Sequence, residues 1–241
     1  DPLPDRDMAD AHTKTHLLFQ AHMQRVPLPI TDYLTDSKNV LDQALRICQA
    51  ILDVVAAHGW LQAALSVVHL LQSIIQAVWF GESPLLALPS VSKTNLPIVS
   101  RALSLSSSSS SSLLPLLALK PEDVQNRLTR SKVLSASRAQ DFVRALGKLP
   151  QLRATVSSTA LLPVSPSSSS GREVQVTVTL QHTGGPRPSP TLLAYTPHFH
   201  KSKQASWFVA LGRPATQTLL ALRRVTMAAP TARTRLVFPA E

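Results

Sequence analysis

The sequence predicts an α+β fold with several structural units: a partial helical bundle, a helical hairpin and an antiparallel β-sandwich. Two long apolar patterns with helical periodicity meet at Gly59-Trp60 in the N-terminal third. After residue 151 the period changes to two, which is typical of half-buried strands. A serine run at 106–112 separates these patterns. We therefore expect a bundle over 1–88, a linker with a serine-rich insertion over 89–115, a helix-loop-helix over 116–150 and a sandwich over 151–241.

The charge of the chain is unevenly distributed. The 241 residues carry a net charge of +10, but residues 1–80 hold five Lys or Arg against eight Asp, a net −3, which leaves +13 for the rest. A basic two-thirds favours an anionic partner such as nucleic acid, and a basic surface that serves only solubility is the alternative. A single cysteine, Cys48, excludes an intrachain disulfide and indicates a reducing compartment.

The bundle begins with a short helix over 14–23, after a stretch over 1–13 that we expect to be a linker or an ordered loop. The next helix is predicted over Ser37–His58, with Thr35, Asp36 or Ser37 as its cap. Its apolar positions cover more than half of the helix surface, which predicts that most of it is buried. Gly59 suits the left-handed turn that ends such a helix.

The stretch Trp60–Phe80 is uncharged over about twenty residues, as a membrane span would be. Polar residues nevertheless recur every three or four positions, which places them on one helix face: Gln62, Ser66, His69, Ser73 and Gln76. Amide and imidazole groups are costly in lipid, so we expect a bundle helix and no membrane partner. Trp79 and Phe80 are expected in the core.

The middle of the chain is punctuated by proline. Residues 81–101 are expected to be irregular, and the serine run has no apolar side chains to bury, so we expect a disordered insertion. Pro121, followed by Glu122 and Asp123, is typical of a helix N-terminus. A second short helix is expected over Arg138–Leu146, capped by Ser135 or Ser137.

Six short strands are predicted in the C-terminal third. The clearest is Glu173–Leu180, in which apolar and polar residues alternate strictly. The others are Leu152–Ser157, Thr191–Tyr195, Trp207–Leu211, Leu219–Val225 and Thr234–Phe238. Turn signals between short strands favour a small antiparallel sandwich.

Several segments resemble a known family. Lys14-Thr-His-Leu-Leu-Phe-Gln-Ala-His22, Val40-Leu-Asp-Gln-Ala-Leu-Arg46, Gly59-Trp60-Leu61 and Pro197-His-Phe-His-Lys-Ser-Lys203 are similar to the Sec sixty-three homology unit. That unit takes its name from the translocation J-protein of the endoplasmic reticulum, and it recurs in the double-cassette, Ski-two-like helicases. The resemblance is dense over 14–88 and thinner elsewhere. It implies a fibronectin-like or immunoglobulin-like form for the β-sandwich.

The resemblance also implies a role for the helix before Gly59-Trp60, the structural corner of the bundle. In these helicases this ratchet helix lines the channel for single-stranded nucleic acid, and Arg46 stands where the family has a channel-facing arginine. Its neighbours are Asp42, Gln43, Gln49 and Asp53, of which the first three join Arg46 as channel candidates. The alternative for Arg46 is an ion pair with Asp42, one helical turn away. By the same resemblance the bundle is incomplete, with further helices expected before Asp1.

Motifs for catalysis are missing from the sequence. There is no phosphate-binding Gly-x-x-x-x-Gly-Lys-Ser/Thr segment and no Asp-Glu-x-His segment, so we expect no enzymatic activity, no catalytic residue and no cofactor in this chain. ATP and Mg²⁺ are expected only in a helicase motor elsewhere in the protein. His198 and His200 lack companion ligands for a metal. Lys201 and Lys203 form a basic loop suited to a phosphate or an acidic partner.

The resemblance implies the non-catalytic C-terminal cassette of an ATP-dependent 3′-to-5′ helicase, found in the nucleus and cytosol. Its partners would be the upstream helicase cassettes, other subunits of a cointegrator complex and single-stranded nucleic acid. The first alternative is a protein–protein interaction unit of the protein-translocation type. The second is an unrelated scaffold for acidic partners.

Overall fold

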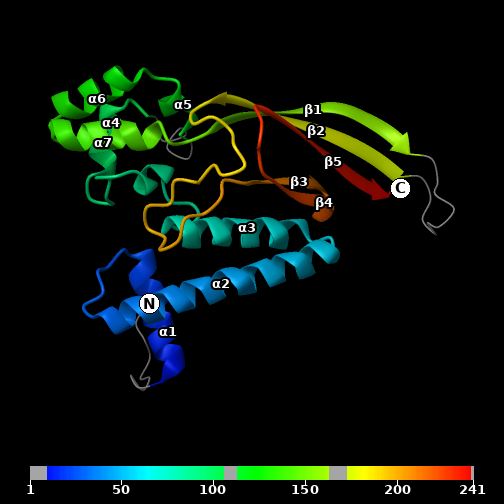
Figure 1. The fold of residues 1–241 in the computed structure, drawn as a ribbon, viewed down its shortest axis with the longest axis horizontal. Helices are drawn as coiled ribbons and strands as arrows, with labels where there is room; N and C mark the ends of the chain where they lie inside the picture. Colours follow the sequence, from blue (N-terminus) through cyan, green and yellow to red (C-terminus); the bar gives the residue numbers. More distant parts are fainter. Residues whose placement is uncertain (1–9, 106–112, 163–172, 240–241) are drawn as a thin grey trace.

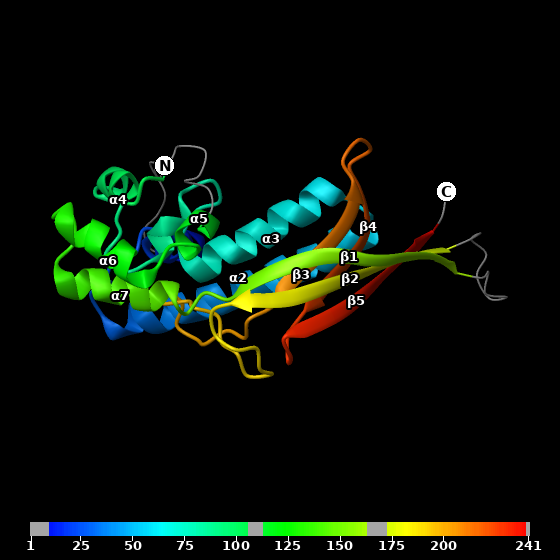
Figure 2. The same cartoon turned by 90° about the horizontal axis from the view of Figure 1, so that it is seen from above.

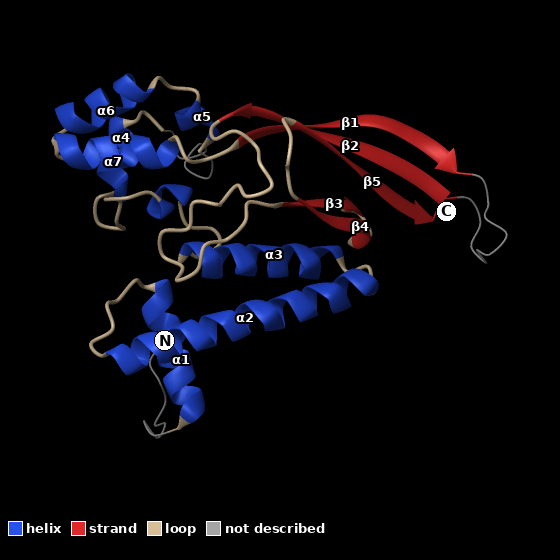
Figure 3. Ribbon diagram, in the orientation of Figure 1, coloured by secondary structure: helices blue, strands red, loops and turns tan. Residues whose placement is uncertain are grey.

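The computed structural model describes residues 10–105, 113–162 and 173–239 (Figure 1). In this part of the chain seven α-helices and one 3-10 helix accompany two small antiparallel sheets. Figure 3 shows the helices on one side and beneath, and the strands on the other side. The prediction of a mixed helical and antiparallel fold is therefore confirmed.

The first three helices are α1 (Ala11–Met23), α2 (Thr31–Ala57) and α3 (Leu61–Gln76). The carboxylate of Asp10 accepts a 2.9 Å hydrogen bond from the backbone N–H of Thr13, so α1 begins before the predicted position. Helix α2 begins six residues before Ser37, and Ile30 occupies its N-cap position without a side-chain cap. The three predicted caps are thus wrong. Proline restricts the backbone only as far as Pro29, and the helix starts directly beyond it.

Helix α2 buries one face and exposes the opposite one. Its buried apolar side chains are Leu41, Leu45, Cys48, Leu52 and Val55, which share a core with apolar residues of α3. Ile47, Ile51 and Val54 are 58%, 44% and 54% exposed. The prediction that most of this helix is buried is therefore wrong. Trp79 and Phe80 are also exposed, contrary to the prediction that they belong to the core.

A second helical group contains η1 (Pro84–Ala87), α4 (Leu96–Ala102), α5 (Leu114–Leu117), α6 (Pro121–Arg130) and α7 (Ala136–Leu146). Its core includes Val99, Leu128 and Phe142, which are fully buried. The helical hairpin is confirmed: Pro121 begins α6, and the Ser135 hydroxyl caps α7. The irregular segment predicted over 81–101 is wrong where η1 and α4 form, because proline is tolerated in a first helical turn. The serine run lies outside the described residues.

Five strands form the two sheets. The larger sheet has the order β1 (Gln151–Leu162), β2 (Glu173–Gly184), β5 (Thr231–Pro239), and the smaller pairs β3 (Trp207–Arg213) with β4 (Thr218–Val225). The strand predicted over Thr191–Tyr195 is wrong: that segment makes a single bridge, between Leu193 and Gln204. Prolines on both sides of it remove backbone N–H donors. The immunoglobulin-like form of the sandwich stays a prediction.

The β3–β4 hairpin lies between the larger sheet and α3 (Figures 1 and 2). Its side chains share a core with the inner face of the larger sheet, centred on Val176, Val178, Leu180, Met227 and Leu236. On its other side the hairpin contacts α2 and α3, where Leu219 and Phe208 join the core of the helices. This stacking leaves a groove between the helices and the hairpin. No helix in the described part is both long and apolar enough to cross a membrane.

Candidate nucleic-acid interface

A groove of about 630 Å³ runs between the helical layer and the β3–β4 hairpin. Its walls come from α2, α3, the segment 194–206 and the two strands of the hairpin. The lining residues with polar or aromatic side chains are Gln49, His69, Gln72, Gln76, Thr196, Lys203, Gln204, Ser206, Trp207, Phe208 and Arg224. No carboxylate is among the lining residues that the structure describes. The groove therefore combines positive charge, aromatic rings and amides.

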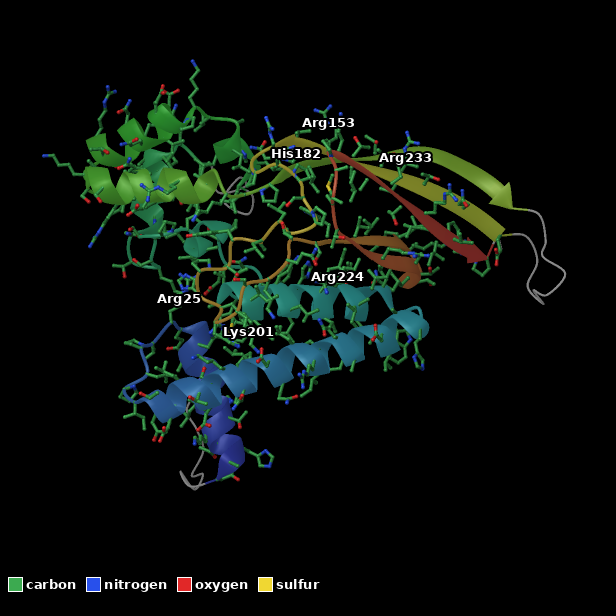
Figure 4. All side chains as sticks on the ribbon, viewed as in Figure 1. Arg25, Arg153, His182, Lys201, Arg224 and Arg233 are labelled. Atoms are coloured by element: carbon green, nitrogen blue, oxygen red, sulfur yellow. The ribbon has the colours of Figure 1, made fainter. Side chains whose placement is uncertain are left out.

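Two cations face aromatic rings beside the groove. The Arg224 guanidinium lies 6.0 Å from the centroid of the Phe208 ring, and its Nε donates a 2.9 Å hydrogen bond to the Ser206 hydroxyl. Figure 4 shows Arg224 between α3 and the strands. The Lys203 ammonium lies 4.5 Å from the Phe199 ring centroid. Burial lowers the pKa of Lys203, so this ammonium has given up part of its water shell. An arriving anion can replace that water.

Helix α3 supplies amide and imidazole groups to the same groove. The Gln76 amide N–H donates a 3.0 Å hydrogen bond to the backbone carbonyl of Tyr195, which ties α3 to the facing loop. The amide oxygen of Gln76 is buried and has no hydrogen-bond partner among the described residues. His69 stacks on Phe80, with ring centroids 3.9 Å apart and an interplanar angle of 9°. The polar face that the sequence predicts for this helix thus turns toward the groove at its C-terminal half.

Asp42, one of the predicted channel residues, is engaged within the chain. Its carboxylate pairs with the Lys201 ammonium, and its Oδ1 lies 3.3 Å from His200 Nε2. The bond from Lys201 holds the pKa of Asp42 below its usual value. Burial lowers the pKa of His200, so that ring is neutral at pH 7 and the ammonium of Lys201 is the charge paired directly with Asp42. Asp42 therefore anchors the basic loop to α2.

The other channel candidates lie at different places on α2. Gln49 lines the groove. Arg46 is exposed. It stands four residues after Asp42 and three before Gln49, so the three side chains share one face of the helix. Asp42 pairs with Lys201, and no ion pair joins it to Arg46 in the described residues. Gln43 is exposed on a neighbouring face of the helix. The arrangement thus places Arg46 beside the groove, with its guanidinium open to solvent.

The structural corner fixes α2 and α3 to the hairpin. Gly59 has a φ of +71°, as the predicted left-handed turn requires. The Leu219 N–H donates to the Gly59 carbonyl at 2.6 Å, and the Leu61 N–H donates to the Gln217 carbonyl at 3.0 Å. Trp60 bridges to Thr218 and remains 53% exposed. The backbone around Gly59 therefore sets the distance between the two walls of the groove.

Lys201 and Lys203 of the basic loop have different surroundings. Lys201 is bound to Asp42, whereas Lys203 lines the groove.

His22 and Arg25 contact the C-terminal end of α3. The His22 ring lies 2.7 Å from the Ile74 carbonyl, and the Arg25 Nε donates to the Ala77 carbonyl at 3.2 Å. Across the described part of the chain, no three metal-binding side chains gather into a site.

Trp207, Phe208 and Arg224 are groove residues that were not predicted from the sequence as site residues. Trp207 and Phe208 could have been predicted from the sequence, because the pair begins four residues after Lys203. Aromatic rings close to a positive charge are typical of single-strand binding sites. Arg224 has no such signal, since only the strand register brings it opposite Phe208. The groove is chemically suited to hold phosphates with its cations, to stack bases on its rings and to hydrogen-bond base edges through its amides.

Comparison with known proteins gives matches over nearly the whole chain. The family model described as the Sec63 Brl domain matches residues 2–241. The chain is 35% identical over 247 residues to "Activating signal cointegrator 1 complex subunit 3" of Homo sapiens, covering 89% of this chain and 11% of that protein. It is 33% identical over 226 residues to "DExH-box ATP-dependent RNA helicase DExH14" of Arabidopsis thaliana, covering 93% of this chain and 10% of that protein. The chain thus spans about a tenth of the length of these relatives.

Proposed function

The chain belongs to the Sec63 Brl domain family, and from that premise we propose that it is the non-catalytic C-terminal unit of an ATP-dependent helicase. In this role it holds single-stranded nucleic acid in the groove between the helices and the β3–β4 hairpin. The observation that carries the proposal is a groove in which Lys203 and Arg224 accompany Trp207 and Phe208, with no carboxylate among the described lining residues. Cationic walls with stacking rings are how proteins hold single strands independently of sequence.

Helix α2 is proposed as the ratchet element of this unit. Gln49 lies in the groove and Arg46 lies beside it on the same helix face, where a guanidinium can bind a phosphate or stack on a base. Asp42 takes a different part in this proposal: it holds the basic loop through Lys201 and does not meet the strand. ATP and Mg²⁺ would bind in a motor elsewhere in the protein, and the part of this chain would be to bind the single strand.

The wider biological role is part of the same proposal. The human relative carries a cointegrator complex in its name, and the plant relative is named an ATP-dependent RNA helicase. We extend to this chain partners among upstream helicase cassettes and cointegrator complex subunits, and a location in nucleus and cytosol. The resemblance implies 3′-to-5′ unwinding in alkylation-damage repair, stalled-ribosome rescue and transcriptional coactivation.

A protein-docking role on the opposite face of α2 accompanies this proposal. Ile47, Ile51 and Val54 form an exposed apolar stripe there, at helical spacing. An exposed apolar stripe is typical of a surface that another protein segment covers. Helices of the preceding cassettes are the proposed cover. If this stripe were the whole function, the chain would be an interaction unit of the protein-translocation type, and its groove would not bind nucleic acid.

The test is a titration of a fluorescein-labelled single-stranded oligonucleotide, read by anisotropy at 50 mM salt. Lys203→Gln with Arg224→Gln is expected to weaken binding about tenfold or more, because two phosphate contacts are lost. Lys120→Gln with Lys132→Gln, which removes two exposed charges outside the groove, is the matched control and is expected to bind like the unmodified chain. Equal binding by both variants, or no binding by the unmodified chain, would contradict the proposal.

A further inference from the structure

The outer face of the β1–β2–β5 sheet carries a cluster of arginine, threonine and glutamine side chains. The inner face is apolar and packs on the β3–β4 hairpin, so alternate residues point outward. Strand β5 alternates accordingly, with Thr231, Arg233 and Arg235 exposed between less exposed neighbours. On β1, Arg153 and Thr155 are exposed on the same face. Figure 4 shows Arg153 and Arg233 along this sheet and Arg224 on its opposite side.

The strand register brings these side chains into adjacent rows. Arg153 of β1, Gln181 of β2 and Thr231 of β5 stand side by side in one row. Thr155, Thr179 and Arg233 form the next row. By standard strand spacings, the backbone positions of Arg233 and Arg235 lie about 6.7 Å apart along their strand, and that of Arg153 lies about 12 Å from Arg233 across β2. Three guanidinium groups therefore share one surface, with hydroxyl and amide groups between them.

This face belongs to the most basic part of the chain. Residues 151–241 hold ten Lys and Arg against two acids, Glu173 and Glu241, a net +8. Of the described residues on the outer face, only Glu173 is acidic, and it lies at the far end of β2 from Arg153. In the part of the chain that the structure describes, no salt bridge neutralises the three arginines, and they are exposed to solvent.

The composition of the face distinguishes between two kinds of acidic partner. Protein interfaces are centred on buried apolar and aromatic anchors. No aromatic side chain lies on the outer face in the described residues, and its large apolar residue, Val237, sits at one end. Arginine, threonine and glutamine are instead the side chains that contact phosphate oxygens and sugars. The absence of rings also excludes base stacking here, which leaves the backbone of a nucleic acid as the matching ligand.

We propose that the outer face of the β1–β2–β5 sheet is a second nucleic-acid contact, which binds the phosphodiester backbone through Arg153, Arg233 and Arg235. It lies on the opposite side of the sheet from the groove, so the two contacts use different residues. The contact is expected to be independent of base sequence, since contacts to phosphates carry no sequence information. It is also strongly salt-dependent, since each phosphate contact releases a counterion.

The test compares two triple variants of the whole chain. Arg153→Gln with Arg233→Gln and Arg235→Gln removes the proposed contact, and Arg130→Gln with Lys132→Gln and Arg138→Gln removes the same charge from exposed positions on the helical hairpin. Binding of a labelled oligonucleotide is measured from 50 to 200 mM salt. The sheet variant is expected to bind roughly tenfold more weakly at 50 mM, with a logarithmic salt slope shallower by about 2, whereas the control keeps the original slope. Circular dichroism verifies that both variants fold.

Three results would overturn this inference. The first is an unchanged slope in the sheet variant. The second is an equal loss in the control, which would assign the effect to net charge. The third is binding of polyglutamate, but not of the oligonucleotide, through these arginines, which would assign the face to an acidic protein. The groove variant Lys203→Gln with Arg224→Gln is measured in parallel, so failure of the groove proposal is separable from failure of this one.

Discussion

At the scale of single residues, the loop around His198 depends on uncharged imidazoles. His22 contacts the Ile74 carbonyl and packs edge-on against Phe199, with ring centroids 6.3 Å apart. Arg25 stands beside this group and donates to carbonyls at the end of α3. A proton on either His22 or His198 would bring like charges together here. The loop that carries Lys201 and Lys203 is therefore held best when both rings are neutral.

We predict that acidification destabilises the chain through His198. Burial, followed by the charges of Arg25 and His22, lowers the pKa of His198 from 6.5 to about 4. The unfolded chain binds a proton near 6.5 while the folded chain does not, so the free energy of unfolding is highest above that pH and falls as the pH approaches 4. Urea denaturation at several pH values measures this fall. His198→Gln is expected to flatten the profile between pH 6.5 and 4; a profile parallel to that of the unmodified chain would contradict the prediction.

A second prediction at this scale concerns Gly59. Replacement by alanine is expected to lower the free energy of unfolding by about 1–2 kcal/mol, because an L-residue resists a positive φ. The added Cβ would also lie 3.3 Å from the Leu219 carbonyl oxygen at the hairpin. Thermal unfolding measures the loss. Gly147→Ala is the control, since its backbone is helical and the added Cβ would meet only ordinary contacts. Equal stability of the two variants would contradict this account of the corner.

At the scale of elements, the hydrophobic periodicity of the sequence predicted where most of the helices and strands lie. It placed α2, α3, α6 and β2 because one face of each packs on a neighbour. It misplaced the start of α2, because no residue between Pro29 and Ser37 interrupts a helix, so a possible cap at Ser37 does not mark where the helix begins. It also overestimated the burial of α2. A pattern records which side chains are apolar, and the number of neighbours that cover them depends on tertiary packing.

The two faces of α2 therefore predict different mutational costs. Leu52→Ala is expected to lower the free energy of unfolding by about 2–5 kcal/mol, because it opens a cavity between α2 and α3. Ile51→Ala is expected to cost less than about 1 kcal/mol, since that side chain is 44% exposed. Chemical denaturation of both variants gives the comparison. Comparable losses would show that the exposed stripe is covered in solution.

At the scale of the whole molecule, the candidate site joins segments far apart in the sequence. The polar stripe on α2 was predictable from helical spacing, and Gln49 is the member of it that lines the groove. The facing wall comes from Lys203 to Arg224, and no local pattern indicates that β3 and β4 would stack on α3. The ion pair of Asp42 with Lys201 could not be predicted from the sequence either, because each of the two residues has nearer charged neighbours in the chain. Packing of the hairpin onto the helices thus assembles the groove.

The central claim, that this groove holds a single strand, is tested most directly by locating the strand on the protein. An oligonucleotide containing 4-thiouridine would be crosslinked to the chain with ultraviolet light, and the modified peptides identified by mass spectrometry. The account predicts crosslinks at Trp207 and Phe208 on the hairpin and at His69 on α3, all of which line the groove. Crosslinks confined to the helical hairpin α6–α7 or to the apolar stripe of α2, with none in the groove, would contradict it.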